Sequence, residues 1–122
     1  MKNEHELDEV IVISGEVTDL DVAYKIIQIN RSAKKRKINF DMSLSKVRSL
    51  LKTKKCYYTG VEMNHTHEDL HQLTFDRVDN EKGYTDDNVV ACTRIINTRK
   101  NDLKVTEIEQ LYKALKKHGD LK

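Results

Sequence analysis

The 122-residue sequence contains no tryptophan and no proline, and it has only four glycines and two cysteines. It also lacks a run of about 18 apolar residues, which a membrane-spanning helix needs, and the basic-then-apolar leader of a secreted protein. We therefore expect a soluble, cytoplasmic protein with no membrane partner. With 38% hydrophobic residues, a chain of this length fits one small domain that buries roughly 60 to 70% of its unfolded surface.

The net charge of +2 hides a strong asymmetry along the chain. Residues 1–24 carry one basic side chain against seven acidic ones, whereas residues 25–55 carry eleven basic side chains against one acidic one. We interpret residues 1–17 as an acidic tail and the basic segment as a surface for a polyanion. The candidate DNA-binding residues in this segment are Arg31, Lys34, Lys35, Arg36 and Lys37.

The remaining chain, 18–122, is predicted to form a single domain whose first part, 18–55, is basic and helical. Thr18 and Asp21 have the spacing of a capping box, and apolar residues then recur on one face, which predicts a helix over Leu20 to Lys35. Ser43 is a plausible N-cap for a second short helix that ends near Leu51.

Residues 72–103 indicate two strands followed by a helix. Gln72 to Val78 and Asn88 to Cys92 have the composition of strands, Gly83 in the loop between them suits a positive-φ turn, and a helix is expected from about Thr93 to Asp102. The fold class is therefore α+β with a ββα core.

A last helix is predicted over 105–118. Thr106 and Glu109 have capping-box spacing, and Gly119 is suited to end the helix. An apolar stripe marks the expected packing face, made of Val105, Ile108, Leu111, Tyr112 and Leu115.

Two oxygen-bearing side chains of the ββα segment suggest a cation site. A helix can present Asn97 toward the end of the preceding strand, where Asp76 offers a carboxylate, and oxygen ligands with waters suit one hard cation such as Mg²⁺ or Mn²⁺. Such a cation stabilises charge on a phosphate. Arg94, Arg99 and Lys100 lie on or beside the same helix and are candidates to hold flanking phosphates.

These spacings resemble the HNH (His-Me finger) endonuclease family. In the ββα segment, the similar residues are Leu73-x-x-Asp76-Arg77-Val78, Asn88-Val-Val, and Asn97 followed three residues later by Lys100. Upstream, the segments Arg31 to Arg36, Ile38 to Leu44 and Cys56-Tyr-Tyr-Thr-Gly60 resemble the first half of small phage members. The resemblance covers about residues 20–103. It implies a ββα-metal fold and DNA, in its double-stranded form, as the partner. It also implies that Asp76 and Asn97 bind the metal, Asn88 braces the loop and Lys100 touches DNA.

Arg77 departs from the family, which has a general-base histidine at this position. A guanidinium stays protonated and accepts no proton from water. Three alternatives follow: a base from elsewhere, with His71 first and His65 or His67 behind it; a metal-bound hydroxide with Arg77 clamping phosphate, which gives slow cleavage; or an inactive nuclease. Arg77 is equally suited to pair with Asp79.

The cysteines predict no structural zinc. Zinc-stapled relatives have two Cys-x-x-Cys pairs, whereas this chain has Cys56 with Thr59 and then Thr93 with Ile96. One thiol cannot complete a tetrahedral site. We expect Cys56, Tyr58 and Cys92 to pack together instead.

Three functions are consistent with the sequence. The first is an HNH-like DNA endonuclease that uses one divalent cation, in which His71 is the first candidate for the base. The second is an inactive HNH scaffold, a phage-encoded regulator or inhibitor of a host protein or DNA transaction, in a bacterial cytoplasm. The third is a DNA-binding protein that acts through its basic segment alone. As a monomer a single small domain makes one nick, and a double-strand cut needs a homodimer.

Overall fold

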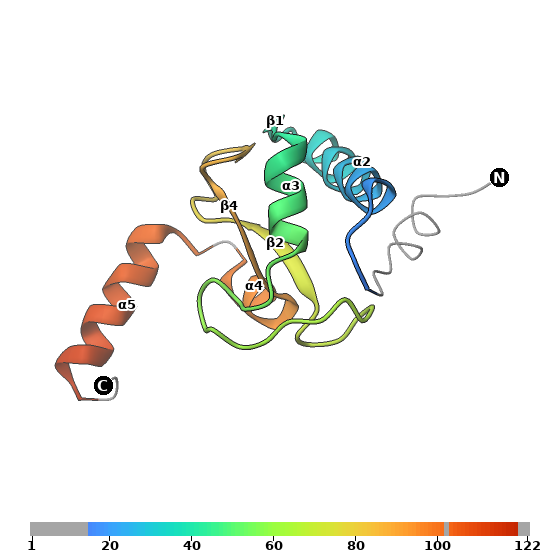
Figure 1. Ribbon diagram of the computed structural model, residues 1–122. Coiled ribbons are helices and arrows are strands. Elements are labelled where there is room, and N and C mark those ends of the chain that lie inside the picture. Colours follow the sequence, from blue (N-terminus) through green and yellow to red (C-terminus); the bar gives the residue numbers. More distant parts are fainter. Residues whose placement is uncertain (1–14, 102, 120–122) are drawn as a thin grey trace.

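The computed structural model of the protein describes residues 15–101 and 103–119. These residues form an α+β fold in which two small sheets lie among helices (Figure 1). The elements are, in order, α2 (Asp19–Lys35), β1 (Phe40–Asp41), α3 (Leu44–Leu51), β2 (Leu73–Arg77), β3 (Tyr84–Thr85), β4 (Val89–Thr93), α4 (Arg94–Lys100) and α5 (Val105–Lys117). Most of the predicted acidic tail, residues 1–14, lies outside the described residues.

The two predicted N-terminal helices are confirmed, together with their caps. Thr18 Oγ1 accepts from the backbone N–H of Asp21 at 3.2 Å, and the Asp21 carboxylate accepts from the Thr18 N–H at 2.8 Å. Ser43 Oγ accepts from the N–H of Lys46 at 3.0 Å. The two helices pack on each other and enclose the core with buried Val22, Ala33, Val47, Leu50 and Leu51.

The hairpin of β2 and β4 confirms the two predicted strands. They pair antiparallel, with Phe75 opposite Ala91 and Asp76 opposite Val90. Because side chains alternate along a strand, Leu73 and Phe75 enter the core beneath α2 and α3, whereas Thr74 and Asp76 face the other side, which α4 covers. This alternation places a carboxylate under a helix.

A second, parallel pair of strands, β1 with β3, has no counterpart in the sequence-based prediction. Gly83 precedes β3, and the expectation of a positive φ there is wrong, since the positive-φ glycines of the described residues are Gly15, Gly60 and Gly119. Gly83 is needed for close approach instead. A Cβ at this position would lie 2.6 Å from the backbone oxygen of Asn39, which accepts from the N–H of Tyr84 at 2.8 Å.

The C-terminal helix α5 forms as predicted, but its expected capping box is wrong. The cap lies at Lys104, before the first helical residue Val105, and the Glu107 carboxylate accepts from the backbone N–H of Lys104 at 3.0 Å. Glu109 pairs instead with Lys113 at 3.3 Å. No residue of α5 is buried, so its apolar stripe is exposed rather than packed on the body.

Candidate functional site

A polar cavity of about 380 Å³ opens at the end of β2. Residues from α2, β2, the loop after β2, β3 and α4 meet there, so segments far apart in the sequence supply its walls. Its lining consists of Ser32, Arg36, Phe75, Asp76, Arg77, Asn80, Tyr84, Asn97 and Asn101. Asp76 and Asn97, the two predicted metal ligands, are thus brought together, and two predicted phosphate-binding arginines line the same space.

Asp76 is buried, with 8% of its surface exposed, and two side chains hold its carboxylate. The Tyr58 hydroxyl donates to Oδ2 at 2.6 Å, and Lys100 Nζ lies 3.3 Å from Oδ2 and 3.5 Å from Oδ1. Burial, and after it the bond to this carboxylate, raise the pKa of Tyr58 above its ordinary value, so Tyr58 stays a donor. Sequence reasoning placed Tyr58 against the cysteines and missed this contact, because the two partners are 18 residues apart.

Lys100, predicted to touch DNA, is buried inside the protein. Only 6% of its surface is exposed, and Nζ also donates to the backbone oxygen of Arg77 at 2.8 Å. A buried ammonium requires a paired anion and further acceptors, and Asp76 and this carbonyl meet that requirement. Lys100 therefore acts inside the protein, as the positive partner of Asp76.

Asn97 projects from α4 onto the same strand. Its Nδ2 donates to Thr74 Oγ1 at 3.0 Å and to the backbone oxygen of Phe75 at 3.3 Å. A carbonyl accepts only, so the nitrogen of the amide must face the strand. The Asn97 amide oxygen is consequently the atom that remains for the cavity.

The donor set fits a hard cation that keeps much of its water. Among residues 15–101 and 103–119, Asp76 Oδ1 has only its 3.5 Å contact with Lys100, and a carboxylate has about four acceptor sites in total. Among the described residues there is no cluster of three or more His, Cys, Asp or Glu suited to a metal. One carboxylate and one amide oxygen nevertheless suit Mg²⁺, which commonly takes its other ligands from water and phosphate.

Arg77 faces the opposite side of β2 from Asp76 and shapes the adjoining loop. Its Nη1 donates to the backbone oxygens of Asn80 at 3.0 Å and Lys82 at 2.8 Å, and its guanidinium lies 5.3 Å from the centre of the Tyr84 ring. Arg77 therefore hydrogen-bonds backbone carbonyls, and not the Asp79 carboxylate with which the sequence also suggested a salt bridge. Arg77 thus holds its charge at the cavity wall.

Asn88 is buried and spans the same loop. Its Oδ1 accepts from the N–H of Asp79 at 3.0 Å, and its Nδ2 donates to the oxygens of Asp79 at 3.0 Å and Gly83 at 2.9 Å. These three bonds close the loop between the strands. Asn88 contributes to the site by positioning, and it does not line the cavity.

Arg36 connects the basic surface of α2 to the cavity. Its Nη2 donates to the Tyr84 hydroxyl at 2.6 Å and to Ser32 Oγ at 3.0 Å. The other predicted DNA-binding residues of this segment are exposed around it, at the end of α2 and just beyond: Arg31, Lys34, Lys35 and Lys37. A positively charged surface therefore leads to the cavity mouth.

The three candidate histidines all lie outside this cavity. His71 precedes β2, five residues from Asp76, or roughly 17 Å along an extended strand. It is exposed, so the expectation that it supplies the base at Asp76 is not supported by its position. His67 lines a groove with Arg94, whose Nη1 donates to the Glu68 oxygen at 3.2 Å.

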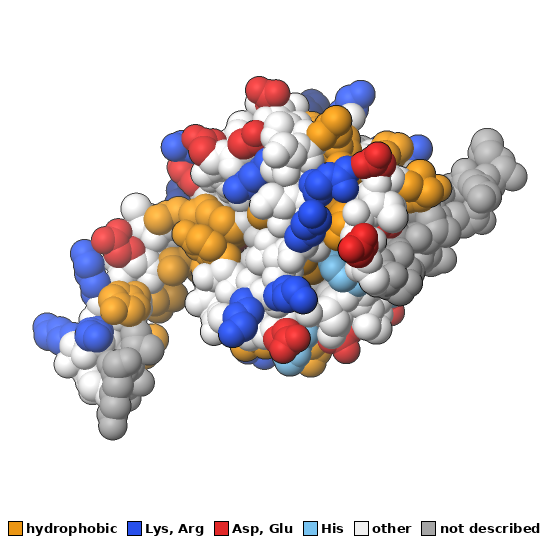
Figure 2. Space-filling view, in the orientation of Figure 1, with side chains coloured by type: hydrophobic (Ala, Val, Ile, Leu, Met, Phe, Trp, Pro, Cys, Tyr) orange, Lys and Arg blue, Asp and Glu red, His pale blue; other side chains and the backbone are white. Residues whose placement is uncertain are grey.

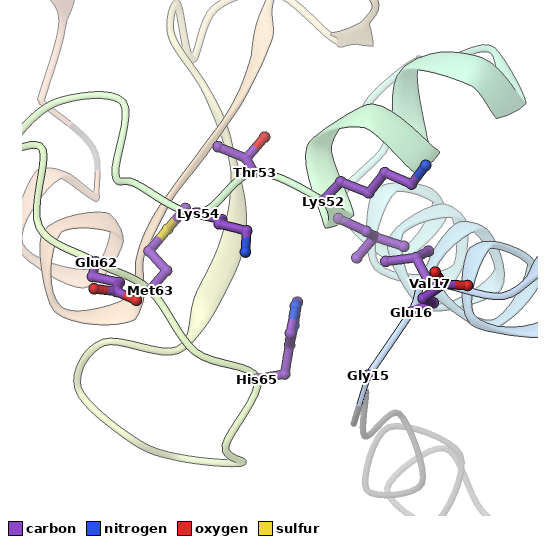
Figure 3. A pocket seen from close by; sticks show the side chains of 10 residues that line it. Gly15, Glu16, Val17, Lys52, Thr53, Lys54, Glu62, Met63 and His65 are labelled. Carbon is purple, nitrogen blue, oxygen red and sulfur yellow. The ribbon is translucent and has the colours of Figure 1, made fainter.

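His65 lines a separate cavity of about 500 Å³, where it points between Lys54 and the segment Gly15 to Val17 (Figure 3). Burial, and then the charge of Lys25, lower the pKa of His65 below its ordinary value. This larger cavity shares no lining residue with the one at Asp76.

The other two cations of α4 do not line the cavity. Arg94 begins the helix at the end far from Lys100, and Arg99 is exposed. Arg99 remains a candidate for a flanking phosphate, whereas Arg94 is held at the groove beside His67.

Cys56 and Cys92 are both buried and unpaired as disulfides. Burial opposes charge on Cys56, but hydrogen bonds from Thr59 and from the backbone at Thr93 outweigh it and lower the pKa of its thiol to about 7. Burial raises the pKa of Cys92 to about 12.

Comparison with known proteins relates the chain to a phage protein. The chain is 31% identical over 77 residues to an uncharacterized 29.0 kDa protein from the dda-modA intergenic region of Enterobacteria phage T4. The match covers 63% of this chain and 31% of that protein, so the chain is similar to about a third of a longer phage protein. No protein-family model matches, and no solved structure matches. No helix in the described ranges is long and apolar enough to cross a membrane.

Proposed function

We propose that the protein is a DNA endonuclease of the HNH type, with a ββα-metal core formed by β2, β4 and α4. The observation that carries this proposal is the convergence of Asp76 and Asn97 on a cavity that Arg36 and Arg77 also line. Oxygen ligands beside guanidinium groups suit the cleavage of a phosphodiester, since charge develops on phosphate oxygens. Similarity to part of a phage protein is consistent with a phage origin.

The roles of the residues follow from their contacts. A divalent cation held by Asp76 and Asn97 would lower the pKa of a water and neutralise charge on the scissile phosphate. Arg36 and Arg77 would hold the phosphate through charge-assisted hydrogen bonds. Tyr58 and Lys100 orient the Asp76 carboxylate.

The described lining of the cavity holds no proton-accepting base other than the Asp76 carboxylate, which this proposal uses as a metal ligand. Guanidinium groups and the protonated Tyr58 accept no proton at neutral pH. We therefore expect slow cleavage, which corresponds to the alternative in which Arg77 clamps phosphate.

A plasmid-nicking assay with Mg²⁺ or Mn²⁺ tests the proposal. We expect Asn97→Ala to abolish nicking and to weaken cation binding in calorimetry, while Thr98→Ala, an exposed change on the same helix, cleaves normally. Thermal unfolding of both variants separates loss of function from loss of fold. Unchanged nicking by a folded Asn97→Ala variant would refute the role given to this site.

The internal pairing of Asp76 with Lys100 favours a second candidate function, a binding module that reuses the scaffold. An ammonium already neutralises the carboxylate in this module, and the cationic surface binds DNA or an acidic host protein. Purified protein that binds DNA equally well with and without divalent cations, and never nicks it, would establish this alternative.

A further inference from the structure

We propose that α5 is a self-association helix that pairs, antiparallel, with α5 of a second copy of the chain. The main apolar positions of the helix are Val105, Ile108, Tyr112 and Leu115. Their separations of three, four and three residues are those of the a and d positions of a coiled coil, which pack side by side against a partner helix. Leu111 widens the stripe.

Apart from the partly buried Ile108, this stripe faces solvent. Leu111 is 55% exposed, Tyr112 52% and Leu115 46%. Figure 1 shows α5 standing apart from the two sheets, and Figure 2 shows hydrophobic side chains on its surface. A helix of 13 residues is marginal in water without tertiary packing. The helix therefore requires a partner that covers its apolar face.

The distribution of charge along α5 identifies that partner as a second copy. Glu107 and Glu109 lie in the first half of the helix, and Lys113, Lys116 and Lys117 lie in the second half. Glu109 and Lys116 directly follow Ile108 and Leu115 and so flank the stripe, and antiparallel pairing would place Glu109 of each copy beside Lys116 of the other. The stripe and these two flanking charges are thus complementary to a second, antiparallel copy.

Contacts at the start of α5 fix its position relative to the cavity. Asn80, which lines the cavity, donates from Nδ2 to the backbone oxygens of Asn101 at 3.3 Å and Leu103 at 3.2 Å. Lys104 Nζ lies 3.5 Å from a Glu81 carboxylate oxygen. A dimer built on α5 would hold two cavities in a defined arrangement. The consequence that such a dimer cuts both strands rests on the proposed function.

Sedimentation equilibrium of the full chain, without DNA or divalent cation, tests the association. We expect a reversible monomer–dimer equilibrium that Leu115→Asp weakens about tenfold or more. Gln110→Asp, on the opposite face of the helix, introduces the same charge and should leave the equilibrium unchanged. Thermal unfolding checks that both variants retain the body of the protein.

Charge reversal tests the direction of pairing. The variants Glu109→Lys and Lys116→Glu should each dimerise poorly alone and form a mixed dimer together. A wild-type chain that stays monomeric at about 1 mM, the weak end of protein affinities, would overturn the proposal. So would a dimer insensitive to Leu115→Asp. Because no cleavage is measured, this failure leaves the endonuclease proposal standing, and loss of nicking leaves the dimer standing.

Discussion

Asp76 and Arg77 are neighbours in the sequence, but they act on opposite faces of β2. Asp76 lies under α4, where Lys100 and Tyr58 hold its carboxylate. Arg77 lies on the other face, above the Tyr84 ring, and holds two carbonyls of the adjoining loop. Both side chains line the same cavity, which opens at the end of β2.

Replacement of Lys100 by methionine should strongly destabilise the protein. The change leaves a buried carboxylate with no cationic partner, for which a cost of about 3 to 5 kcal/mol is expected. Urea denaturation near neutral pH measures the free energy of unfolding. Arg99→Ala, an exposed change one residue away, should alter it by no more than about 0.5 kcal/mol. An equally small loss for Lys100→Met would show that the pair contributes little.

The thiol of Cys56 should make stability depend on pH. Its pKa falls from 9.0 in the unfolded reference to about 7 in the fold. A group with a depressed pKa contributes stability that is complete above the unfolded pKa and is lost as pH falls through the folded one. The stability difference between wild type and Cys56→Ser should therefore grow between about pH 6 and pH 9. Thermal melts across this range measure it, and a flat difference would contradict the prediction.

The site residues could be predicted from the sequence where their spacing along the chain fixes the secondary structure around them. Asp76 and Asn97 meet because a strand end and the next helix are adjacent in a ββα segment. Lys100 lies three residues after Asn97, on the same face of α4, and therefore also points toward β2. Its ion pair with Asp76 could not be predicted, because the spacing does not show that both side chains are buried. The hydrogen bond of Arg36, at the C-terminal cap of α2, to Tyr84 is a long-range contact of the same kind.

At the scale of elements, alternating apolar residues and helix N-caps predicted strands and helices correctly, whereas strands of two residues could not be predicted. The caps at Thr18 and Ser43 mark the helix starts because side-chain acceptors satisfy the first free N–H groups. The strands β1 and β3 contain two residues each, too few for a periodic pattern. Their pairing depends on Gly83, which the sequence alone suggests as a turn residue.

Gly83→Ala should destabilise the protein and disturb the loop that Asn88 and Arg77 hold. The added Cβ would lie 2.6 Å from the Asn39 oxygen, a backbone atom that cannot yield cheaply. Overpacking of this kind typically costs about 1 to 3 kcal/mol. Chemical denaturation measures the loss, with the exposed change Glu81→Ala as the control. Wild-type stability in Gly83→Ala would mean that β1 and β3 separate without penalty.

For the whole molecule, cations concentrate at the end of α2 and lead to the cavity through Arg36. If these cations contact phosphates, DNA affinity must fall steeply with salt, because each neutralised phosphate releases counterions. Lys34→Ala with Lys37→Ala should lower the slope of log affinity against log salt by about 0.9 for each phosphate that the variant no longer neutralises. Fluorescence anisotropy over a range of salt concentrations measures the slope. Lys117→Ala, near the end of α5, serves as the control, and an equal effect there would argue against a localised surface.

The contacts of Tyr58 and Lys100 with Asp76 also have a consequence for how the protein is assembled. Because Tyr58 and Lys100 already satisfy the buried Asp76 carboxylate, we expect the domain to fold without a bound metal ion. A chelator should accordingly lower the melting temperature by no more than the cation's binding contributes and should leave the domain folded, in contrast to zinc-stapled domains, which unfold when their metal is withdrawn.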